Sequence, residues 1–501
     1  MTKKIAVLGF YFLIRAARLM AQTASGVPED LPASSAEKTA EDAVNPDAAL
    51  DEQRFRIIRY GTDTEISSLI RALRAEKTGE NAETPLDGEL QLLAEKTGNR
   101  AILSGVFGYF GERKKTGLED RARRAVEERD DEAAETVLAA IDYLGMVQAG
   151  GCSEAFEDIL KGEETRYLAS TIRAMGRCAG GSESAGDAAA FLIDYYQNRD
   201  PAGENRREII LALGETGSGG AVEFLVTIAD SEDERAPLRI AALDSIAKIA
   251  DEGGLEAALR AVSSKDPNVR SAAIGALAPF EGARVEEAVI EAFRDSYYRS
   301  RIAAAKSAAE RKIAAAVPFL RFRAENDEVP SVKDEAIRAL GAIGTQDAVK
   351  ALEDLFNEKK NPDRVRIGAA EMLLALNESY TGAVIAAMDE AKTRSQTALY
   401  NGLLKDLGTA KLDNLRDLAA RLFAGGGVIE KSYAIDICAN NDYRDLAGEL
   451  QKLTDPKNGS LSRKSAALLE KWGMPAEAPA EIPALPAETP EESAEESGPQ
   501  E

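Results

Sequence analysis

The sequence predicts an all-α protein, built as a solenoid of short helices stacked in antiparallel pairs. The chain has 501 residues, more than one globular core usually contains, so several domains or a repeat array are expected. Apolar residues make up 44% but aromatic residues only 6%, a composition typical of closely packed helices rather than sheets. The third observation is a basic residue that recurs about every 32 residues over the second half of the chain.

The first helix of each predicted unit carries this basic residue. Small residues follow it and an apolar residue closes the segment, as in PLRIAALDSIA (237–247) and NVRSAAIGALA (268–278). The basic positions, here called the anchor column, are Arg206, Arg239, Arg270, Arg301, Lys333, Arg366, Lys431 and Arg463. Neighbouring anchors are 31 to 33 residues apart, except for one unit near Tyr400 that has no basic residue.

A second helix lies between successive anchors. Apolar residues recur at i, i+3, i+4 and i+7 in segments such as GGAVEFLVTIAD (219–230) and QDAVKALEDLFN (346–357), which gives one apolar helix face. Turn residues such as GETGSGG and DEGG separate the two helices. Because a single helix pair cannot bury its apolar face alone, the pairs are expected to stack on one another.

The best-formed unit is Asp266-Pro267-Asn268-Val269-Arg270 with small residues after it, and it resembles the HEAT family in its short, phycobilisome-lyase-type variant. The resemblance is specific from residue 204 onward and looser over 53–203, where Gly145 and Gly176 keep a 31-residue step. It implies a right-handed, armadillo-like α-solenoid with the anchor helices on the concave side. It also implies a scaffold rather than an enzyme.

The two ends of the chain differ from this body. Lys3 and Lys4 precede an apolar run, Ile5 to Ile14, that is too short to span a membrane and is typical of a signal peptide. The predicted division is a signal peptide (1–22), a disordered acidic linker (23–52), divergent helical repeats (53–203), HEAT-like repeats (204–474) and a disordered Pro/Glu-rich tail (475–501). We therefore expect a periplasmic or secreted protein; a cytoplasmic protein that retains its N-terminus is the alternative.

Composition excludes several kinds of chemistry. The chain has no histidine, which excludes His-dependent nucleophile pairs and His-ligated zinc, and its three cysteines cannot form a four-cysteine zinc site. No phosphate loop or dinucleotide fingerprint occurs, so no cofactor is expected. The net charge of −24 disfavours nucleic-acid binding, and no second apolar span is present after the N-terminus.

The anchor column has a structural and a functional interpretation. Acids precede several anchors: Asp266, Asp295 and Asp327. The structural interpretation is a ladder of hydrogen bonds and ion pairs between neighbouring turns, and the functional one is a basic concave strip for an acidic ligand. The negative charge of the body favours the ladder.

Two further groups of residues stand out in the N-terminal third. A basic cluster interleaved with acids predicts either a solvated helix face or a docking patch for an acidic partner, and it comprises Arg113, Lys114, Lys115, Arg121, Arg123 and Arg124. Cys152 and Cys178 fall between helices of adjacent units, where stacked loops approach, and a disulfide between them is predicted for an oxidising compartment. Cys438 lies in an apolar run and is expected to be buried.

These observations favour a non-catalytic, exported scaffold that binds an unidentified protein partner through its concave surface. The first alternative is an envelope enzyme, or an enzyme accessory, that uses paired carboxylates in a concave pocket. The second is a cytoplasmic scaffold of the same architecture.

Overall fold

The computed structural model describes residues 46–76, 84–162, 164–199, 203 and 205–474. These residues form 26 α-helices, α2 to α27, and no strand, which confirms the all-α class. The predicted signal peptide, the Pro/Glu-rich tail and the linker up to residue 45 lie outside the described residues. The predicted linker was too long, because its last seven residues, 46 to 52, form the start of α2 (Pro46–Tyr60). Proline is tolerated in the first turn of a helix, and the alanine, leucine and glutamate that follow favour it.

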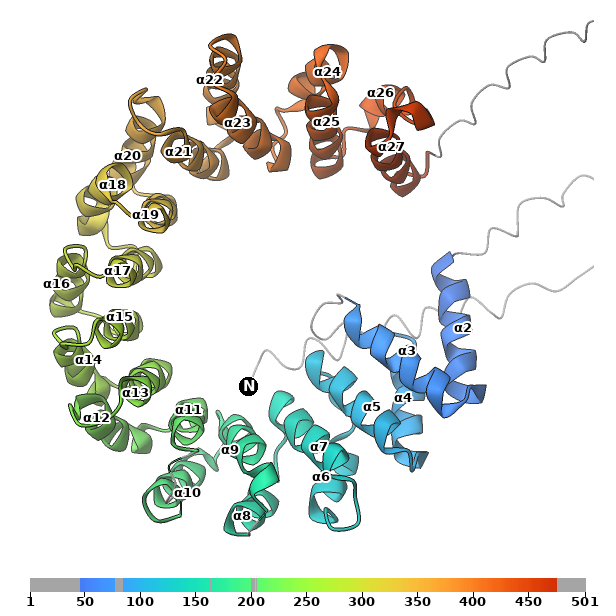
Figure 1. Ribbon diagram of the computed structural model, residues 1–501, viewed down its shortest axis with the longest axis vertical. Helices are drawn as coiled ribbons and strands as arrows, with labels where there is room; N and C mark the ends of the chain where they lie inside the picture. The colour runs from blue at the N-terminus through green and yellow to red at the C-terminus, as the bar shows by residue number, and fades with distance from the viewer. Residues whose placement is uncertain (1–45, 77–83, 163, 200–202, 204, 475–501) are drawn as a thin grey trace, which may run out of the picture.

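The helices are arranged as a wide open arc in which inner and outer helices alternate (Figure 1). The inner helices are α3 (Asp63–Ala75), α5 (Arg100–Glu112), α7 (Ala134–Met146), α9 (Thr165–Ala179), α11 (Arg206–Thr216), α13 (Ala236–Ile249), α15 (Pro267–Ala276), α17 (Tyr298–Glu310), α19 (Pro330–Ile343), α21 (Asp363–Leu376), α23 (Thr397–Thr409), α25 (Val428–Asn441) and α27 (Ser460–Lys471). The outer helices are α4 (Asp87–Lys96), α6 (Glu119–Glu127), α8 (Ser153–Lys161), α10 (Ala185–Asn198), α12 (Val222–Asp230), α14 (Leu255–Ala261), α16 (Ala283–Ala292), α18 (Val317–Asn326), α20 (Gln346–Asn357), α22 (Thr381–Thr393), α24 (Arg416–Gly425) and α26 (Ala447–Gln451). Every anchor lies on an inner helix, so the anchor helices line the concave side, as the resemblance implied.

The local sequence explains where the helices begin and end. At the start of α15, the Asp266 carboxylate accepts hydrogen bonds from the backbone N–H groups of Asn268 (2.7 Å) and Val269 (3.4 Å), and Pro267 occupies the first turn. At the ends of α11 and α19, Gly217 and Gly344 adopt the left-handed conformation with φ of 67° and 63°. These caps make the tight turns that reverse the chain between inner and outer helices.

Consecutive inner helices approach closely because small residues lie at their contacts. A Cβ added to Gly145 would lie 2.9 Å from the Cα of Ala174 on the next inner helix, and one added to Gly176 would lie 2.5 Å from the carbonyl oxygen of Ala212. The same relation joins Gly214 to the next inner helix. Backbone atoms cannot rotate away as side chains do, so these glycines fix how closely the units stack.

The outer helices are joined by long side chains instead. Arginines on one outer helix pair with acids on a neighbouring one at about the repeat spacing: Arg124–Glu95, Arg260–Asp230, Arg284–Glu256, Arg321–Asp354 and Arg421–Asp389, with N–O distances of 2.5 to 3.0 Å. Short contacts on the inside and long ones on the outside are consistent with an arc whose concave side carries the inner helices (Figure 1).

The apolar core runs along the whole array in two clusters. The first extends from Ile58 to Val285 and the second from Ile274 to Trp472, so they meet around α15 and α16. The first core cluster continues across the predicted boundary between residues 203 and 204, so the core is not divided there. That boundary concerns only how regular the repeats are in sequence, and it stays a prediction. The largest fully buried aromatic side chains gather in the N-terminal third, among them Tyr109, Tyr143 and Tyr167.

We predict that Gly176→Ala destabilises the protein by about 1–3 kcal/mol, because the new methyl group meets backbone atoms of α11. Gly275→Ala is the matched control: this glycine also lies in an inner helix, but nothing stands within 4 Å of its Cβ position. That change is expected to stabilise by about 0.5–1 kcal/mol, since alanine favours helix. Urea unfolding followed by circular dichroism measures both, and equal effects would contradict the close-packing argument.

Candidate functional site

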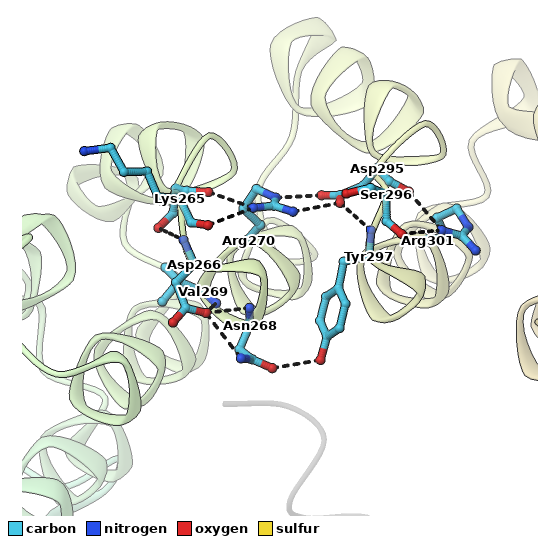
Figure 2. A network of polar contacts seen from close by, with 10 residues as sticks. Lys265, Asp266, Asn268, Val269, Arg270, Asp295, Ser296, Tyr297 and Arg301 are labelled. Carbon is cyan, nitrogen blue, oxygen red and sulfur yellow. Dashed lines mark hydrogen bonds and ion pairs between the residues drawn. The ribbon is translucent and has the colours of Figure 1, made fainter.

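The best-formed part of the anchor column lies on α15 and α17 (Figure 2). The Arg270 guanidinium donates two hydrogen bonds to the Asp295 carboxylate, at 2.8 and 2.9 Å. Arg301 forms the same two-pronged contact with Asp327, at 2.7 and 2.8 Å. Each acid therefore binds the anchor of the preceding unit rather than the anchor that follows it in sequence, and the contacts join consecutive units.

These contacts are largely withdrawn from water. The side chain of Asp327 is fully buried and that of Arg301 is 10% exposed. Burial raises the pKa of Asp327, but hydrogen bonds from Arg301 and from the backbone N–H of Val329 outweigh it and hold the pKa below its ordinary value. The Arg270 guanidinium likewise lowers the pKa of Asp295. Both carboxylates are thus charged and fully partnered at neutral pH.

Most anchors share a second contact, in which they cap the end of the preceding outer helix. Arg239 donates to the carbonyl of Ala229 (3.0 Å) in the last turn of α12, and Arg366 donates to that of Phe356 (2.9 Å) in the last turn of α20. Lys333 donates to Glu325 at the end of α18, and Arg270 to Ser264 just beyond α14. Unpaired carbonyls and negative partial charge gather at a helix C-terminus, so a cation there is stabilising.

Three anchors depart from this pattern. Arg206 lies 5.0 Å from the ring centre of Tyr196, and its Nε has no hydrogen-bond partner. Among the described residues, neither the Lys431 nor the Arg463 side chain makes a hydrogen bond or an ion pair, and Arg463 is exposed. The prediction of a ladder contact was wrong at these last two positions. At the last unit Lys464, one residue further on, binds the Asp436 carboxylate (2.6 Å) instead.

The basic cluster of the N-terminal third is used inside the molecule. Arg113 is buried, donates to the carbonyl of Leu73 and lies 4.2 Å from the ring centre of Tyr109. Lys115 is also buried and pairs with Asp87 at 2.5 Å. The other contacts are Arg121–Glu132 (2.8 Å), Arg123–Asp120 (2.5 Å) and Arg124–Glu95 (3.0 Å), while Lys114 is exposed. Arg113 and Lys115 are thus internal partners of a carbonyl and an acid, while Arg121, Arg123 and Arg124 pair with acids that are at least partly exposed. These contacts favour the structural interpretation, and the docking patch stays a prediction.

Cys152 and Cys178 are present as free thiols at the turn between α7 and α8. The disulfide between them stays a prediction, and the geometry of the pair is taken up below. Cys438 is fully buried in the second core cluster.

The concave surface is formed by inner-helix positions that lie outside the buried helix face and do not cap an outer helix. Positions one and five residues after an anchor point away from the helix face that packs in the core, and they are half-buried or exposed. We call them the inner-face columns: Arg207, Ile240, Ser271, Ile302, Asp334 and Ile367, with Leu211, Asp244, Gly275, Lys306, Arg338 and Glu371. Sequence reasoning missed these columns, although the anchor period would have located them. Apolar, acidic and basic residues alternate along them, so the concave surface is neither a uniform apolar strip nor a uniformly charged one.

One pair of carboxyl groups lies on this side of the array. Burial, together with the nearby negative charge of Glu371, raises the pKa of Asp406 to about 7. The Oδ2 atom of Asp406 is buried and has no hydrogen-bond partner. Among the described residues, no three acids or cysteines are grouped as a metal site would require, and none of the helices described could cross a membrane.

A solenoid of stacked helix pairs, with arginines that bind the acid of the next unit, defines a HEAT repeat protein. The family described as Spirochaete HEAT repeat protein matches residues 58–468, and the chain belongs to this family. None of the curated proteins compared with the chain matches it.

Several solved structures are similar in fold. The crystal structure of Kap121p is 11% identical, with a TM-score of 0.41, over 86% of this chain and 56% of that one. Kap121p bound to Pho4p is 11% identical, with a TM-score of 0.40, over 86% and 54% of the two chains. The X-ray structure of YIBA_ECOLI is 15% identical, with a TM-score of 0.36, over 59% of this chain and 99% of that one. This chain thus spans about half the length of the Kap121p chain.

We predict that Arg301→Met destabilises the protein by about 3–5 kcal/mol, because it leaves the buried Asp327 carboxylate with only the longer ion-pair contact to Arg323, at 3.5 Å. The control is Arg364→Met, which removes the exposed pair between Arg364 and Asp334 on neighbouring inner helices and is expected to cost less than about 1 kcal/mol. Urea midpoints measured for both variants in the full chain test this. Comparable losses would show that the ladder is no more than a surface ion pair.

We predict that Asp406 makes the protein less stable as the pH rises. Its folded pKa of about 7 lies above the ordinary value of 3.8. The contribution of this carboxyl group to the free energy of unfolding is therefore fully present below pH 3.8 and is lost as the pH rises through about 7. Asp406→Asn should therefore stabilise by about 2–4 kcal/mol at pH 8 and little at pH 4. The exposed Asp413→Asn is the control in the same urea titrations; a pH-independent difference for Asp406→Asn would contradict the assignment.

Proposed function

We propose that the protein is a non-catalytic, exported scaffold that binds another protein through its concave surface. The observation that carries this proposal is the pair of inner-face columns on the inside of the arc (Figure 1). The anchors and glycines of the inner helices are committed to capping and stacking. The inner-face columns include some residues with contacts along the array, such as Asp334 with Arg364, but all of these residues are partly or fully exposed, and they extend over at least six consecutive units.

The chemistry of the inner-face columns supports a protein partner. Ile240, Ile302 and Ile367 offer apolar contacts, while Asp244 and Lys306 offer charges of opposite sign. Protein interfaces have such a mixture of apolar and polar area, with charges that fix the register. A nucleic acid would need a surface rich in unpaired cations, which this alternation does not provide.

The proposal of export rests on the N-terminal sequence. Lys3 and Lys4, the apolar run Ile5 to Ile14 and the small residues near Ala21 form the three regions of a signal peptide. The absence of histidine and the small number of cysteines give no information on whether the protein is exported.

The catalytic alternative would rest on Asp406 and Glu371. Oδ2 of Asp406 is shielded from solvent. A general acid must reach the atom it protonates, so this carboxyl group is poorly placed to act on a substrate in its present position. We therefore favour binding over catalysis as the role of the concave surface.

Site-specific photo-cross-linking in intact cells tests the proposal. A photoreactive residue at Lys306, exposed on α17, is expected to give a discrete cross-linked protein, whereas one at Lys350, exposed on the outer helix α20, is not. Ile302→Arg beside Lys306 should reduce the cross-link at least tenfold. Phe322→Arg, at an exposed apolar residue of the outer helix α18, should leave it unchanged.

The outcomes separate the parts of the proposal. Equal cross-linking from both faces, or none from the concave side, would overturn the concave binding surface. The same purified chain reports on export through its N-terminal residue, read by mass spectrometry. A mature chain that begins after the Ala21 region supports export, and a chain that begins at Met1 supports the cytoplasmic alternative.

A further inference from the structure

The fold brings two of the three cysteines to one turn. Cys152 is the residue just before α8, at the end of the turn that follows α7, and it is 2% exposed. Cys178 lies near the end of α9, the inner helix of the next unit, and is partly exposed. Although they are 26 residues apart in sequence, both face the short connection between α7 and α8.

Hydrogen bonds to this connection fix the position of each sulfur atom. The Cys178 thiol donates to the carbonyl of Leu144, at an Sγ–O distance of 3.3 Å. The same carbonyl accepts the backbone N–H of Ala149 at 2.9 Å. The next residue, Gly150, offers the carbonyl toward which the Cys152 thiol points, at 3.6 Å. The Leu144 carbonyl in the last turn of α7 and the Gly150 carbonyl in the connection after it therefore hold both thiols at the same end of α7.

The surroundings favour a thiolate at Cys152. Its pKa is lowered first by its interaction with the neighbouring Cys178 thiol and also by the nearby Arg123 guanidinium, and these effects outweigh burial. Arg123 is held in place by its own hydrogen bond to the Gly150 carbonyl, at 2.9 Å. Cys152 also stands at the N-terminus of α8, where the helix dipole stabilises negative charge. A thiolate is the nucleophile in disulfide exchange, so Cys152 is the thiol that reacts first.

We propose that Cys152 and Cys178 are a reactive dithiol that low-molecular-weight disulfides convert into an intramolecular disulfide bond. The Cys152 thiolate attacks one sulfur of the small disulfide, which breaks its S–S bond, forms a mixed disulfide and expels one small thiolate. Cys178 then loses its proton and attacks the Cys152 sulfur, and the second small thiolate leaves. The two protein thiols are oxidised and one small disulfide is reduced to two thiols.

The bond would tie one repeat to the next. It would connect the α7–α8 turn with α9, at the edge of a stack that is otherwise held by small-residue packing such as that of Gly145 on Ala174. The backbone of this turn can shift to bring the two sulfur atoms together. Two of its residues, Gln148 and Gly151, already adopt positive φ angles of 54° and 73°, and Gly150 is exposed. Opening of this turn also admits the oxidant to Cys152. The inference does not depend on the proposed binding function.

Cys438 supplies a control within the same chain. It is fully buried, burial raises its pKa to about 12, and its helix, α25 (Val428–Asn441), lies far round the arc from α8 and α9 (Figure 1). Within the described part of the chain it has no partner thiol, and the nearby charge that acts on it is the negative one of Asp445, which does not stabilise a thiolate. An oxidant that acts by thiolate exchange should therefore leave it unchanged in the folded protein.

The experiment uses the reduced full-length protein and oxidised glutathione. After incubation, free thiols are alkylated under denaturing conditions and peptides are mapped without reduction. We expect a peptide pair joined through Cys152 and Cys178, Cys438 fully alkylated, and a mass lower by two hydrogens with no glutathione retained. Cys178→Ser should trap glutathione on Cys152, while Cys438→Ser should react as the unchanged protein does.

Two results would overturn the proposal. One is that all three cysteines remain alkylatable after the folded protein has been exposed to a large excess of oxidised glutathione. The other is that Cys152 and Cys178 each retain glutathione without joining. Because mapping is done on the unchanged sequence, neither result depends on whether a serine variant folds.

Discussion

The close approach of consecutive inner helices is the constraint on which the rest of the structure depends. Where Gly145 and Gly176 meet the next inner helix, even one additional carbon atom would stand within 3 Å of backbone atoms. The outer helices are instead joined across longer gaps by arginine–acid pairs such as Arg284–Glu256. A stack that is tight on one side and wider on the other must curve toward the tight side. The arc and its concave surface thus follow from which residues are small.

The arginine ladder adds polar contacts to this stack near the point where the two core clusters meet. The clusters meet around α15 and α16, where the bridge from Arg270 to Asp295 lies, and the bridge from Arg301 to Asp327 follows in the next unit. Each alanine-rich helix buries little side-chain area, so large side chains do not fix how neighbouring units align. A buried ion pair whose polar atoms all have hydrogen-bond partners fixes this alignment instead. Such a pair contributes more to the uniqueness of the arrangement than to net stability.

The sequence predicts the features that recur in each unit, but it does not predict contacts that depend on how neighbouring units stack. The anchor period, the Asp266-Pro267 start and the small residues after each anchor recur often enough to identify the helix pairs. The sequence alone could not show that Asp295 serves Arg270 rather than Arg301, because that choice depends on the rise between units. Likewise Arg113 and Lys115 look like surface charges, and only the packing of α3 to α5 brings carbonyls and Asp87 to them.

Each inner helix meets four demands, and the fourth is where function can vary. One stripe of small residues contacts its neighbours, a second packs on the outer helices, and the anchor caps the end of an outer helix. These three demands recur in most units, so they keep the residue types similar, although Arg206, Lys431 and Arg463 do not cap an outer helix. The remaining stripe changes from Ile240 to Ser271 to Ile302 to Asp334 while the anchors beside it stay basic. Since structure alone does not require that variation, the inner-face columns are the part of the solenoid in which recognition of a partner can be encoded.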